Sequence, residues 1–375
     1  MYPRLLIDIE KLKHNIDVLG ALAGKAGCSL SIVTKSICAD DRACDMIASH
    51  PAVSYMADSR ISNIKKYHEK AHAAGKQTLL LRLPMMCEIE DVVKYADISF
   101  NSEVSTIKAL NEEAGRQGVI HRVVLMVDLG DLREGIFFRD LSFEDKKHCC
   151  RKASGPDAVL NAARLVQDSE NLELYGISTN LTCYGAIIPK HDNLSVLCEI
   201  AECIENELGV KLQMISGGNS SSVYLVDKNE LPEKINNLRP GEGYLLGNET
   251  AYGKRIEGTF DDALMIEAQI IELKRKPSVP IGEVGMDAFG NRPEFEEHGI
   301  ITRAILGIGE QDMDVTGMIP VDKKIRVLGA SSDHMILDVT EAEQHFHVGD
   351  TVRFKLKFGA MLKAATSTYV EKYYL

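Results

Sequence analysis

Residues 28–36 read CSLSIVTKS, an apolar run rich in β-branched residues that ends on Lys35. A continuous apolar run of this kind is typical of a parallel strand, because both faces of such a strand are covered. A lysine at its end suits an amine that must lose its proton, since burial disfavours the ammonium form. Taken alone, Lys35 is better explained as a solvated side chain, as most lysines are. Motifs elsewhere in the sequence favour the interpretation of Lys35 as a reactive amine instead.

Eight short apolar runs follow one another between residues 29 and 247, separated by segments with helical periodicity. The runs are SLSIVTK, VSYMADS, QTLLLRL, DISFNS, RVVLMVDLG, LELYGISTN, KLQMISGG and EGYLLG. The helical segments place apolar residues on one face, as in Leu12, Ile16, Leu19 and Ala23, and in Leu194, Leu197, Ala201, Ile204 and Leu208. The pattern predicts an α/β fold, a (β/α)8 TIM-like barrel, over residues 11–250.

Residues 251–375 have a different texture, because strand-like runs follow one another with turns and no helix between them. The segment PSVPIGEVGMDAFGNRPEF holds Pro and Gly at turn positions and is predicted to be loop. Together with residues 1–10, this part predicts a C-terminal all-β domain.

Composition excludes several classes of protein. The 375 residues carry a net charge of −12, which argues against binding a nucleic-acid backbone. No apolar run approaches the roughly 18 residues of a membrane span, and the N-terminus has acidic residues where a signal peptide would be apolar. Nine cysteines form no CxxC pair and no zinc-type spacing. We therefore expect a cytoplasmic protein without a metal site or a membrane partner.

Polar residues that close the apolar runs form a coherent set. In a barrel, catalytic groups lie where strands end, and these positions hold Lys35, Arg133, Asn180 and Arg239. The turn of residues 216–222, SGGNSSS, offers converging N–H groups and hydroxyls that suit a phosphate. Taken alone it fits equally a polar surface loop. A second glycine turn, RPGEG at 239–243, follows one βα unit later, where barrels commonly hold phosphate.

A phosphate site and a strand-end lysine in a barrel point to pyridoxal 5'-phosphate (PLP) bound covalently by the lysine. The chain resembles the fold-type III PLP enzymes, the alanine racemase family, and most closely its ornithine racemase-like branch. Six segments resemble the family in order: LLIDIEKLKHNID, IVTKSICAD, MVDLGDLREGI, GISTNLTCYG, ISGGNSSSVYL and LRPGEGYLLG. The resemblance extends into the β domain and implies a PLP-dependent amino-acid racemase.

The resemblance also implies residue roles. Lys35 would hold the cofactor and then act as a base on one face of Cα, while Arg133 would help to hold the substrate carboxylate. Arg239 would face the pyridine nitrogen, with Asn180 beside it where the family often has a histidine. The phosphate contacts would be Ser220 and Gly241, with Asn219 and Glu242 next to them.

Two features depart from the family pattern. Alanine racemases take a second base, a tyrosine, from the β domain, but residues 284–290 read VGMDAFG. The candidates for this base are Asp287 in that segment, and Cys183 or Tyr184 beside the barrel mouth. In addition, Ala39 stands where a phosphate-binding tyrosine is found in the family, and Phe358 matches a later one.

The β domain matches the part of the family that shapes the far end of the pocket across a dimer. Asp333 and His334 lie in that neighbourhood, as do Glu310 and Asp312, and a buried ammonium would need such a carboxylate. The alternative is that these are solvated turn residues. The resemblance thus implies a homodimer with shared active sites that acts on ornithine or another basic amino acid.

Two other functions remain open at this point. One is a PLP-dependent decarboxylase of the same fold type, which Arg239 disfavours, as does the absence of a cysteine after Cys203. The other is a non-catalytic PLP-binding protein, although single-barrel relatives of that kind lack a second domain.

Overall fold

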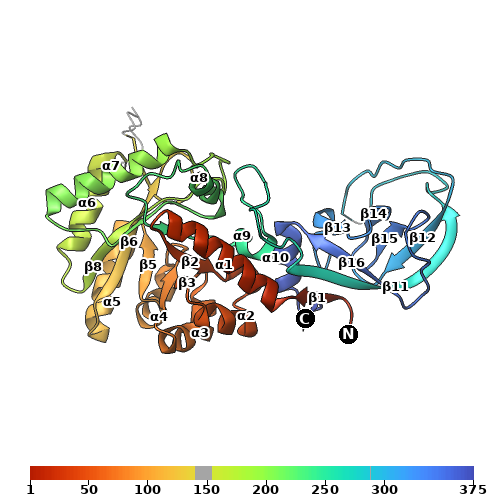
Figure 1. The fold of residues 1–375 in the computed structure, drawn as a ribbon, viewed down its shortest axis with the longest axis horizontal. Helices are drawn as coiled ribbons and strands as arrows, with labels where there is room; N and C mark the ends of the chain where they lie inside the picture. Colours follow the sequence, from red (N-terminus) through yellow and green to blue (C-terminus); the bar gives the residue numbers. More distant parts are fainter. Residues whose placement is uncertain (140–153, 288) are drawn as a thin grey trace. The chain divides into compact units, whose positions relative to one another are not determined.

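The computed structural model describes residues 1–139, 154–287 and 289–375 and divides into two compact units. The barrel unit comprises Leu12–Thr259, and the β unit comprises Met1–Lys11 with Phe260–Leu375. Figure 1 shows each unit with its labelled elements.

Eight parallel strands of the barrel unit close on themselves, because β5 pairs with β4 on one side and with β6 on the other. In chain order they are β2 (Ser29–Val33), β3 (Val53–Asp58), β4 (Gln77–Leu80), β5 (Ile98–Asn101), β6 (His121–Asp128), β8 (Leu172–Ser178), β9 (Met214–Ser216) and β10 (Asn237–Leu238). The short strand β7 (Ile136–Phe137) adds to β6. The predicted TIM-like barrel is confirmed.

Helices surround these strands on the outside (Figure 1). They are α1 (Ile9–Lys25), α2 (Asp41–Ser49), α3 (Ile61–Ala73), α4 (Ile89–Tyr95), α5 (Val104–Gln117), α6 (Pro156–Gln167), α7 (His191–Leu208), α8 (Val223–Asp227) and α9 (Glu242–Leu246). The predicted apolar faces are buried, including Leu12 and Ile16 of α1 and Leu194 and Leu197 of α7. Burial of these stripes against the strands stabilises helices that would be marginal alone.

The interior of the barrel is filled by side chains from several strands. A buried cluster joins Val33, Ala57, Leu79, Ile98, Phe100, Val124, Met126 and Met214. Because the barrel is packed rather than hollow, ligands can bind only at its ends.

The eighth strand differs from the prediction. The run EGYLLG was predicted as a strand, but Glu242–Leu246 forms helix α9, and the strand is Asn237–Leu238, with residues 239–241 between it and the helix. Two residues are too short to show a period, and one of them, Asn237, is polar although fully buried. The Asn237 amide bonds Ser31 and Ser216 on the two neighbouring strands, so side-chain hydrogen bonds replace part of the ladder.

The β unit is built on one sheet with strand order β13-β16-β11-β12-β15-β14, and β1 joins it between β11 and β17. Its strands are β1 (Arg4–Ile7), β11 (Leu264–Pro277), β12 (Ile300–Leu306), β13 (Met318–Pro320), β14 (Arg326–Ala330), β15 (Met335–Asp338), β16 (Thr351–Leu356) and β17 (Glu371–Tyr374). The predicted β domain is confirmed with one addition, helix α10 (Phe358–Thr366). Its Ala, Met, Leu and Lys residues favour a helix.

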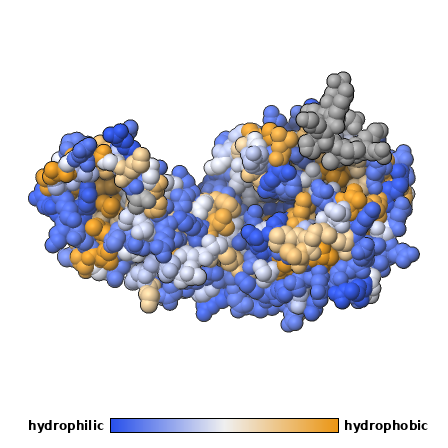
Figure 2. Space-filling view, turned by 180° about the vertical axis from the view of Figure 1, so that it is seen from behind, coloured by the Kyte–Doolittle hydropathy of each residue, from blue (hydrophilic) through white to orange (hydrophobic). Residues whose placement is uncertain are grey.

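The surface resembles that of an ordinary globular protein. On the face drawn in Figure 2, hydrophilic residues predominate and hydrophobic residues form small groups. Among the described residues, no helix has both the length and the hydropathy needed to cross a bilayer. The same residues contain no group of three or more His, Cys, Asp or Glu side chains placed to hold a metal ion.

Candidate active site

Five neighbouring strands of the barrel carry the predicted site residues at one end. The strand order runs β2-β10-β9-β8-β6. Lys35 follows β2, Arg239 follows β10, the turn of residues 217–222 follows β9, Asn180 follows β8 and Arg133 follows β6. Because parallel strands end on the same side, the barrel brings all five positions to its carboxyl-terminal mouth.

Lys35 begins a short 3-10 helix, Lys35–Ile37, directly after β2. Its side chain is exposed, whereas those of Thr34 and Ser36 are fully buried. Among the described residues, no hydrogen bond or ion pair is formed by its amine. The burial expected for this lysine is therefore not found in the structure of this chain. Its backbone is fixed at the mouth, but its side chain extends away from the packed interior.

The turn before Lys35 is held by Asp58, which ends β3. The Asp58 carboxylate is fully buried and accepts hydrogen bonds from the hydroxyl of Thr34 (2.6 Å), the amide of Asn63 and the backbone of Arg60. Burial raises the pKa of Asp58, and these donors oppose that rise. The strand-end rule that points to Lys35 applies equally to Asp58, but the sequence analysis did not include it.

Among the residues that the structure describes, Arg239 is the largest fully buried side chain. Its NH1 atom donates to the hydroxyls of Ser178 (2.8 Å) and Ser216, and its NH2 atom donates to the Thr179 carbonyl (2.9 Å) and the Asn180 side chain (2.7 Å). The ring of Phe100 lies 5.0 Å from the guanidinium carbon. Burial lowers the pKa of Arg239 to about 10, so the group stays positively charged at neutral pH.

Asn180 links Arg239 to a residue that the sequence analysis did not single out, Glu134. While Asn180 accepts from Arg239, its Nδ2 atom donates to Glu134 Oε1 at 2.7 Å. The other neighbour of Glu134 is Arg133, whose Nε and NH2 atoms both donate to the carboxylate. Burial lowers the pKa of Arg133, but the hydrogen bond to Glu134 and the neighbouring negative charges together outweigh burial, and the pKa is raised overall. The sequence did offer an indication of Glu134 as a site residue, because it directly follows Arg133, a predicted site residue.

Ser220 ties together the two glycine turns that were predicted to hold phosphate. Its buried hydroxyl accepts hydrogen bonds from the backbone N–H groups of Gly241 (3.2 Å) and Gly243 (3.0 Å). The turn needs glycine at Gly218, where φ is +112° and a Cβ atom would lie 2.9 Å from Ser222 Oγ. Asn219 closes the turn by accepting from the Ser221 N–H at 2.8 Å.

The residues present fit PLP. The Ser221 hydroxyl in the same turn is fully buried and has no hydrogen-bond partner among the described residues. The Arg239 contacts occupy NH1 and NH2, and Nε donates to none of the described residues. A hydroxyl-rich turn, a fixed cation and an exposed amine match the phosphate, the ring nitrogen and the aldehyde of the cofactor.

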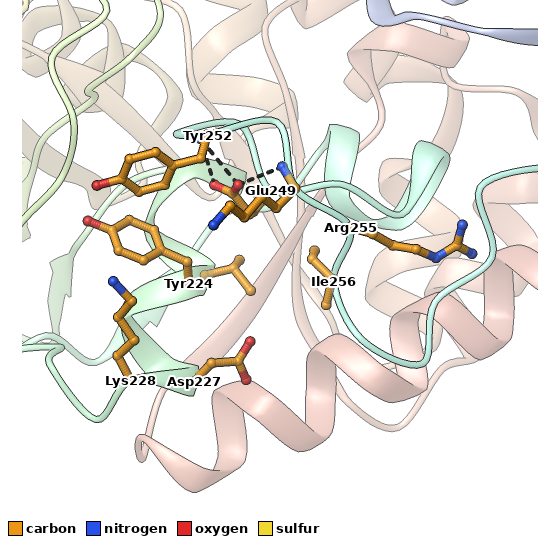
Figure 3. A pocket seen from close by; sticks show the side chains of 9 residues that line it. Tyr224, Asp227, Lys228, Glu249, Tyr252, Arg255 and Ile256 are labelled. Carbon is orange, nitrogen blue, oxygen red and sulfur yellow. Dashed lines mark hydrogen bonds between the residues drawn. The ribbon is translucent and has the colours of Figure 1, made fainter.

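A cavity of about 410 Å³ is lined in part by Val223 and Tyr224, which directly follow the turn of residues 217–222. Figure 3 shows its wall, in which the buried Glu249 carboxylate accepts from backbone N–H groups of Tyr252 and Lys254. The backbone N–H of Ala251 also donates to this carboxylate. Glu249 thereby shapes a loop whose Thr250 contacts Asn219.

Burial raises the pKa of Glu242 to about 7, and the charge of Glu249 adds to this effect.

Cys183 and Tyr184, two candidates for the second base, lie on the loop after β8. Asp131 holds this loop by accepting from the backbone N–H groups of Tyr184 (2.9 Å) and Ile187 (3.1 Å). Both candidate side chains are exposed. The Asn219 amide donates to Cys183 Sγ at 3.1 Å, which places the thiol beside the turn of residues 217–222, the predicted phosphate turn.

Asp287, the third candidate, lies in an exposed loop of the β unit. Its carboxylate accepts from the backbone N–H groups of Asn291 (2.8 Å) and Phe289 (2.9 Å). These bonds lower the pKa of Asp287, with the Asn291 N–H as the main cause. A carboxylate held in this way is a weaker base.

The predicted substrate residues of the β unit share one corner of it. Asp333 and His334 are exposed in the turn between β14 and β15. The loop of residues 309–312 pairs with this turn, because the backbone N–H groups of Glu310 and Gln311 donate to the carbonyls of Ser331 and Ser332. Burial raises the pKa of Asp312, and its N–H donor from Gly309 opposes this. The β unit thus gathers three acidic side chains, those of Glu310, Asp312 and Asp333.

Comparison with known proteins agrees with this geometry. The family model for the alanine racemase N-terminal domain matches residues 7–151. The chain is 50% identical to the ornithine racemase of Acetoanaerobium sticklandii over 372 residues, which cover 99% of both proteins. It is 37% identical to the lysine racemase of Thermotoga maritima over 374 residues, which cover 100% of this chain and 99% of the relative.

A solved structure shares the fold at low sequence identity. The alanine racemase of Bartonella henselae with covalently bound pyridoxal phosphate superposes with a TM-score of 0.70 at 16% identity, covering 100% of this chain and 99% of that one. A chain that shares half of its residues with one racemase and more than a third with another, each along nearly its whole length, belongs to the alanine racemase family of PLP-dependent amino-acid racemases.

Proposed function

We propose that this racemase interconverts the enantiomers of ornithine or another basic amino acid. The observation that supports it most directly is the alignment of Lys35, Arg239, the phosphate turn, Asn180 and Arg133 on five consecutive strand ends. The named substrates of the two relatives, ornithine and lysine, both carry a side-chain ammonium group. The acidic corner of the β unit offers such a group a partner.

The barrel residues divide the work of binding PLP and substrate. PLP, when bound, supplies the electron sink that lets the Cα proton leave. Lys35 holds the cofactor and afterwards accepts or returns a proton on one face of Cα. Arg133 orients the substrate carboxylate. Ser220, Gly241 and their neighbours Asn219 and Glu242 surround the phosphate.

Arg239 controls the outcome of the reaction. A guanidinium does not give up a proton at ordinary pH, so it keeps the ring nitrogen that it faces unprotonated. A weaker electron sink favours rapid reprotonation of Cα over side reactions such as transamination. Asn180 assists by accepting from the Arg239 NH2 atom.

Among the three candidates for the second proton donor, Cys183 has the best-supported position. Its sulfur contacts the Asn219 amide beside the phosphate turn. A thiolate at this position would raise the pKa of Arg239, against the lowering effect of burial, so the sulfur lies within electrostatic reach of that guanidinium. By contrast, Tyr184 is 75% exposed, and Asp287 is bonded to its own loop.

We further propose a homodimer in which the β unit of a second copy completes the pocket. Asp333 and His334 of that copy, with Glu310 and Asp312 beside them, would line the far end of the pocket, and the acids among them would bind the distal ammonium of the substrate. Shared sites can be tested by mixing Lys35→Ala protomers with Asp333→Asn protomers. Each heterodimer would then contain one intact site, so random mixing should restore about a quarter of wild-type activity at low ornithine concentration. A mixture no more active than its two components would contradict shared sites.

The seven described cysteines, at positions 28, 38, 44, 87, 183, 198 and 203, are all free thiols. Free thiols are typical of reducing compartments, which supports placement in the cytoplasm.

The function is tested by isotope incorporation. The holoenzyme is incubated with L-ornithine in D₂O, and deuterium at Cα and accumulation of D-ornithine are expected without release of carbon dioxide. Release of carbon dioxide would instead identify a decarboxylase. Absence of Cα label with ornithine, lysine and arginine would refute the proposed substrate class.

A further inference from the structure

Glu134 occupies a position between the two arginines of the barrel mouth. On one side, Arg133 donates to both of its carboxylate oxygens; on the other, Asn180 donates to Oε1 at 2.7 Å. The Glu134 side chain is only 18% exposed. A carboxylate this far from water needs such partners, so its place is fixed by them.

The amide of Asn180 has a defined polarity in this chain of contacts. Its Nδ2 atom faces the Glu134 carboxylate, and its Oδ1 atom accepts from the NH2 atom of Arg239 at 2.7 Å. The opposite orientation would put oxygen against carboxylate and N–H against guanidinium. The hydrogen bonds to Glu134 and to Arg239 therefore favour the same orientation of the Asn180 amide.

The charge of Glu134 also affects Arg239, the residue at the other end of this series of hydrogen bonds. Among the described residues, no carboxylate contacts the Arg239 guanidinium directly. Burial lowers the pKa of Arg239, and the charge of Glu134 is the largest contribution that opposes this decrease. The negative charge of Glu134 thus acts on Arg239 across the width of one amide group.

We propose that Glu134 is a positioning residue that couples Arg133 to Arg239 through Asn180. A carboxylate arriving at Arg133 competes with Glu134 for the same guanidinium N–H groups. Glu134 then turns its charge more fully toward the Asn180 Nδ2 group, which strengthens Oδ1 as an acceptor for Arg239. Binding of a substrate carboxylate at Arg133 thus changes the hydrogen bond that Arg239, the residue facing the cofactor nitrogen, makes with Asn180. This inference rests on the roles proposed above for Arg133 and Arg239.

A spectroscopic titration tests the coupling without turnover. Propionate carries a carboxylate but no amine, so it can occupy Arg133 and cannot react with bound PLP. In the wild-type holoenzyme, propionate should shift the pH midpoint of the cofactor absorbance. Glu134→Gln keeps the shape of the side chain and removes its charge, and it should abolish that shift. Glu173→Gln is the matched control, because it removes a surface ion pair with Arg122 on the same barrel and should respond like wild type.

A double-mutant cycle gives a second readout. Glu134→Gln and Asn180→Ala should each lower kcat/KM about 10- to 100-fold, as expected for loss of one charge-assisted hydrogen bond. The double variant should be no worse than the more damaging single one, because both break the same chain. If Glu134→Gln does not fold, Asn180→Ala interrupts the chain from the other side and must abolish the propionate response.

The outcomes separate this inference from the function on which it rests. Racemisation by the wild type without any propionate response, an equal response in Glu134→Gln, or fully multiplicative effects in the cycle would each overturn the coupling alone. Failure of the wild type to racemise any basic amino acid would overturn the proposed substrate class, whatever propionate does.

Discussion

The hydroxyl of Thr34 donates a 2.6 Å hydrogen bond to the buried carboxylate of Asp58. This bond joins the ends of β2 and β3 one residue before Lys35. It fixes the backbone from which the reactive amine extends, although neither side chain is assigned a part in proton transfer.

Thr34→Val, which keeps the shape of the side chain and removes the donor, should therefore destabilise the barrel. Loss of one bond to a buried carboxylate should lower the free energy of unfolding by about 1.5–3 kcal/mol. Urea denaturation of the apoprotein measures this. The control Thr368→Val changes an exposed threonine and should stay within about 0.5 kcal/mol of wild type. Equal stability of the two variants would show that the Thr34–Asp58 bond contributes nothing.

Lys35→Ala should separate cofactor attachment from stability. Because the side chain is exposed, its loss should change the free energy of unfolding by less than about 0.5 kcal/mol. Borohydride reduction followed by peptide mass spectrometry should find the pyridoxyl group on Lys35 in the wild type and nowhere in the variant. Lys108→Ala, at another exposed lysine of the barrel, should retain it. A pyridoxyl group on a different lysine would refute the assignment.

Cys183→Ser should slow racemisation equally in both directions but should slow deuterium exchange at Cα unequally for the two enantiomers. Loss of a general acid or base on one face should slow removal of the Cα proton about 10²- to 10⁴-fold for the enantiomer whose proton points to that face. Wash-in of deuterium from each enantiomer, measured separately, reports the two faces. Tyr184→Phe, on the neighbouring residue, should change either rate less than about twofold, because its side chain is largely solvated. Symmetric, small effects of Cys183→Ser would transfer the role to another residue.

Glu242 should make the apoprotein less stable as pH rises. Burial raises its pKa to about 7 from an ordinary value of 4.5, so the folded state binds the proton more tightly than the unfolded state does. This contribution is complete below about pH 4.5 and is lost as pH increases to about 7. The difference corresponds to at most about 3 kcal/mol, which solvent near this partly exposed group reduces to about 1–2 kcal/mol.

Urea denaturation at pH 5 and pH 8 checks this expectation. Glu242→Gln should reduce the difference in stability between the two pH values by that amount, and Glu173→Gln should leave it unchanged. An unaltered difference in Glu242→Gln would mean that its carboxyl group titrates alike in the folded and unfolded chain.

The barrel could be predicted because most of its strands are continuous apolar runs and its helices have one apolar face. The exception is β10, where two residues give no period and a buried asparagine gives no hydropathy signal. Strand-end reasoning pointed to Lys35, Arg133, Asn180 and Arg239, because the carboxyl ends of parallel strands meet whatever the intervening sequence.

Other features depend on contacts that sequence spacing does not encode. Glu134 lies next to Arg133 in sequence. Its proposed positioning role, however, depends on its hydrogen bond with Asn180, which is 46 residues away. Glu249 was missed for a similar reason, since the sequence does not indicate which backbone N–H groups will donate to a carboxylate. Asp58 differs, because it closes β3 and the strand-end rule could have pointed to it. The exposure of Lys35 was also unpredictable, because it depends on the direction of one side chain.

The anchoring of Arg239 has a consequence for attempts to redirect this enzyme. Its guanidinium supplies hydrogens to two serine hydroxyls, a main-chain oxygen and an amide oxygen at the ends of β8 and β9. A carboxylate installed there to favour decarboxylation or transamination would face the Thr179 carbonyl, which has no hydrogen to donate, and would need the two serine hydroxyls and the Asn180 amide to turn and donate instead. Position 239 and these neighbours are therefore expected to change together, and laboratory evolution by single substitutions at position 239 should stall.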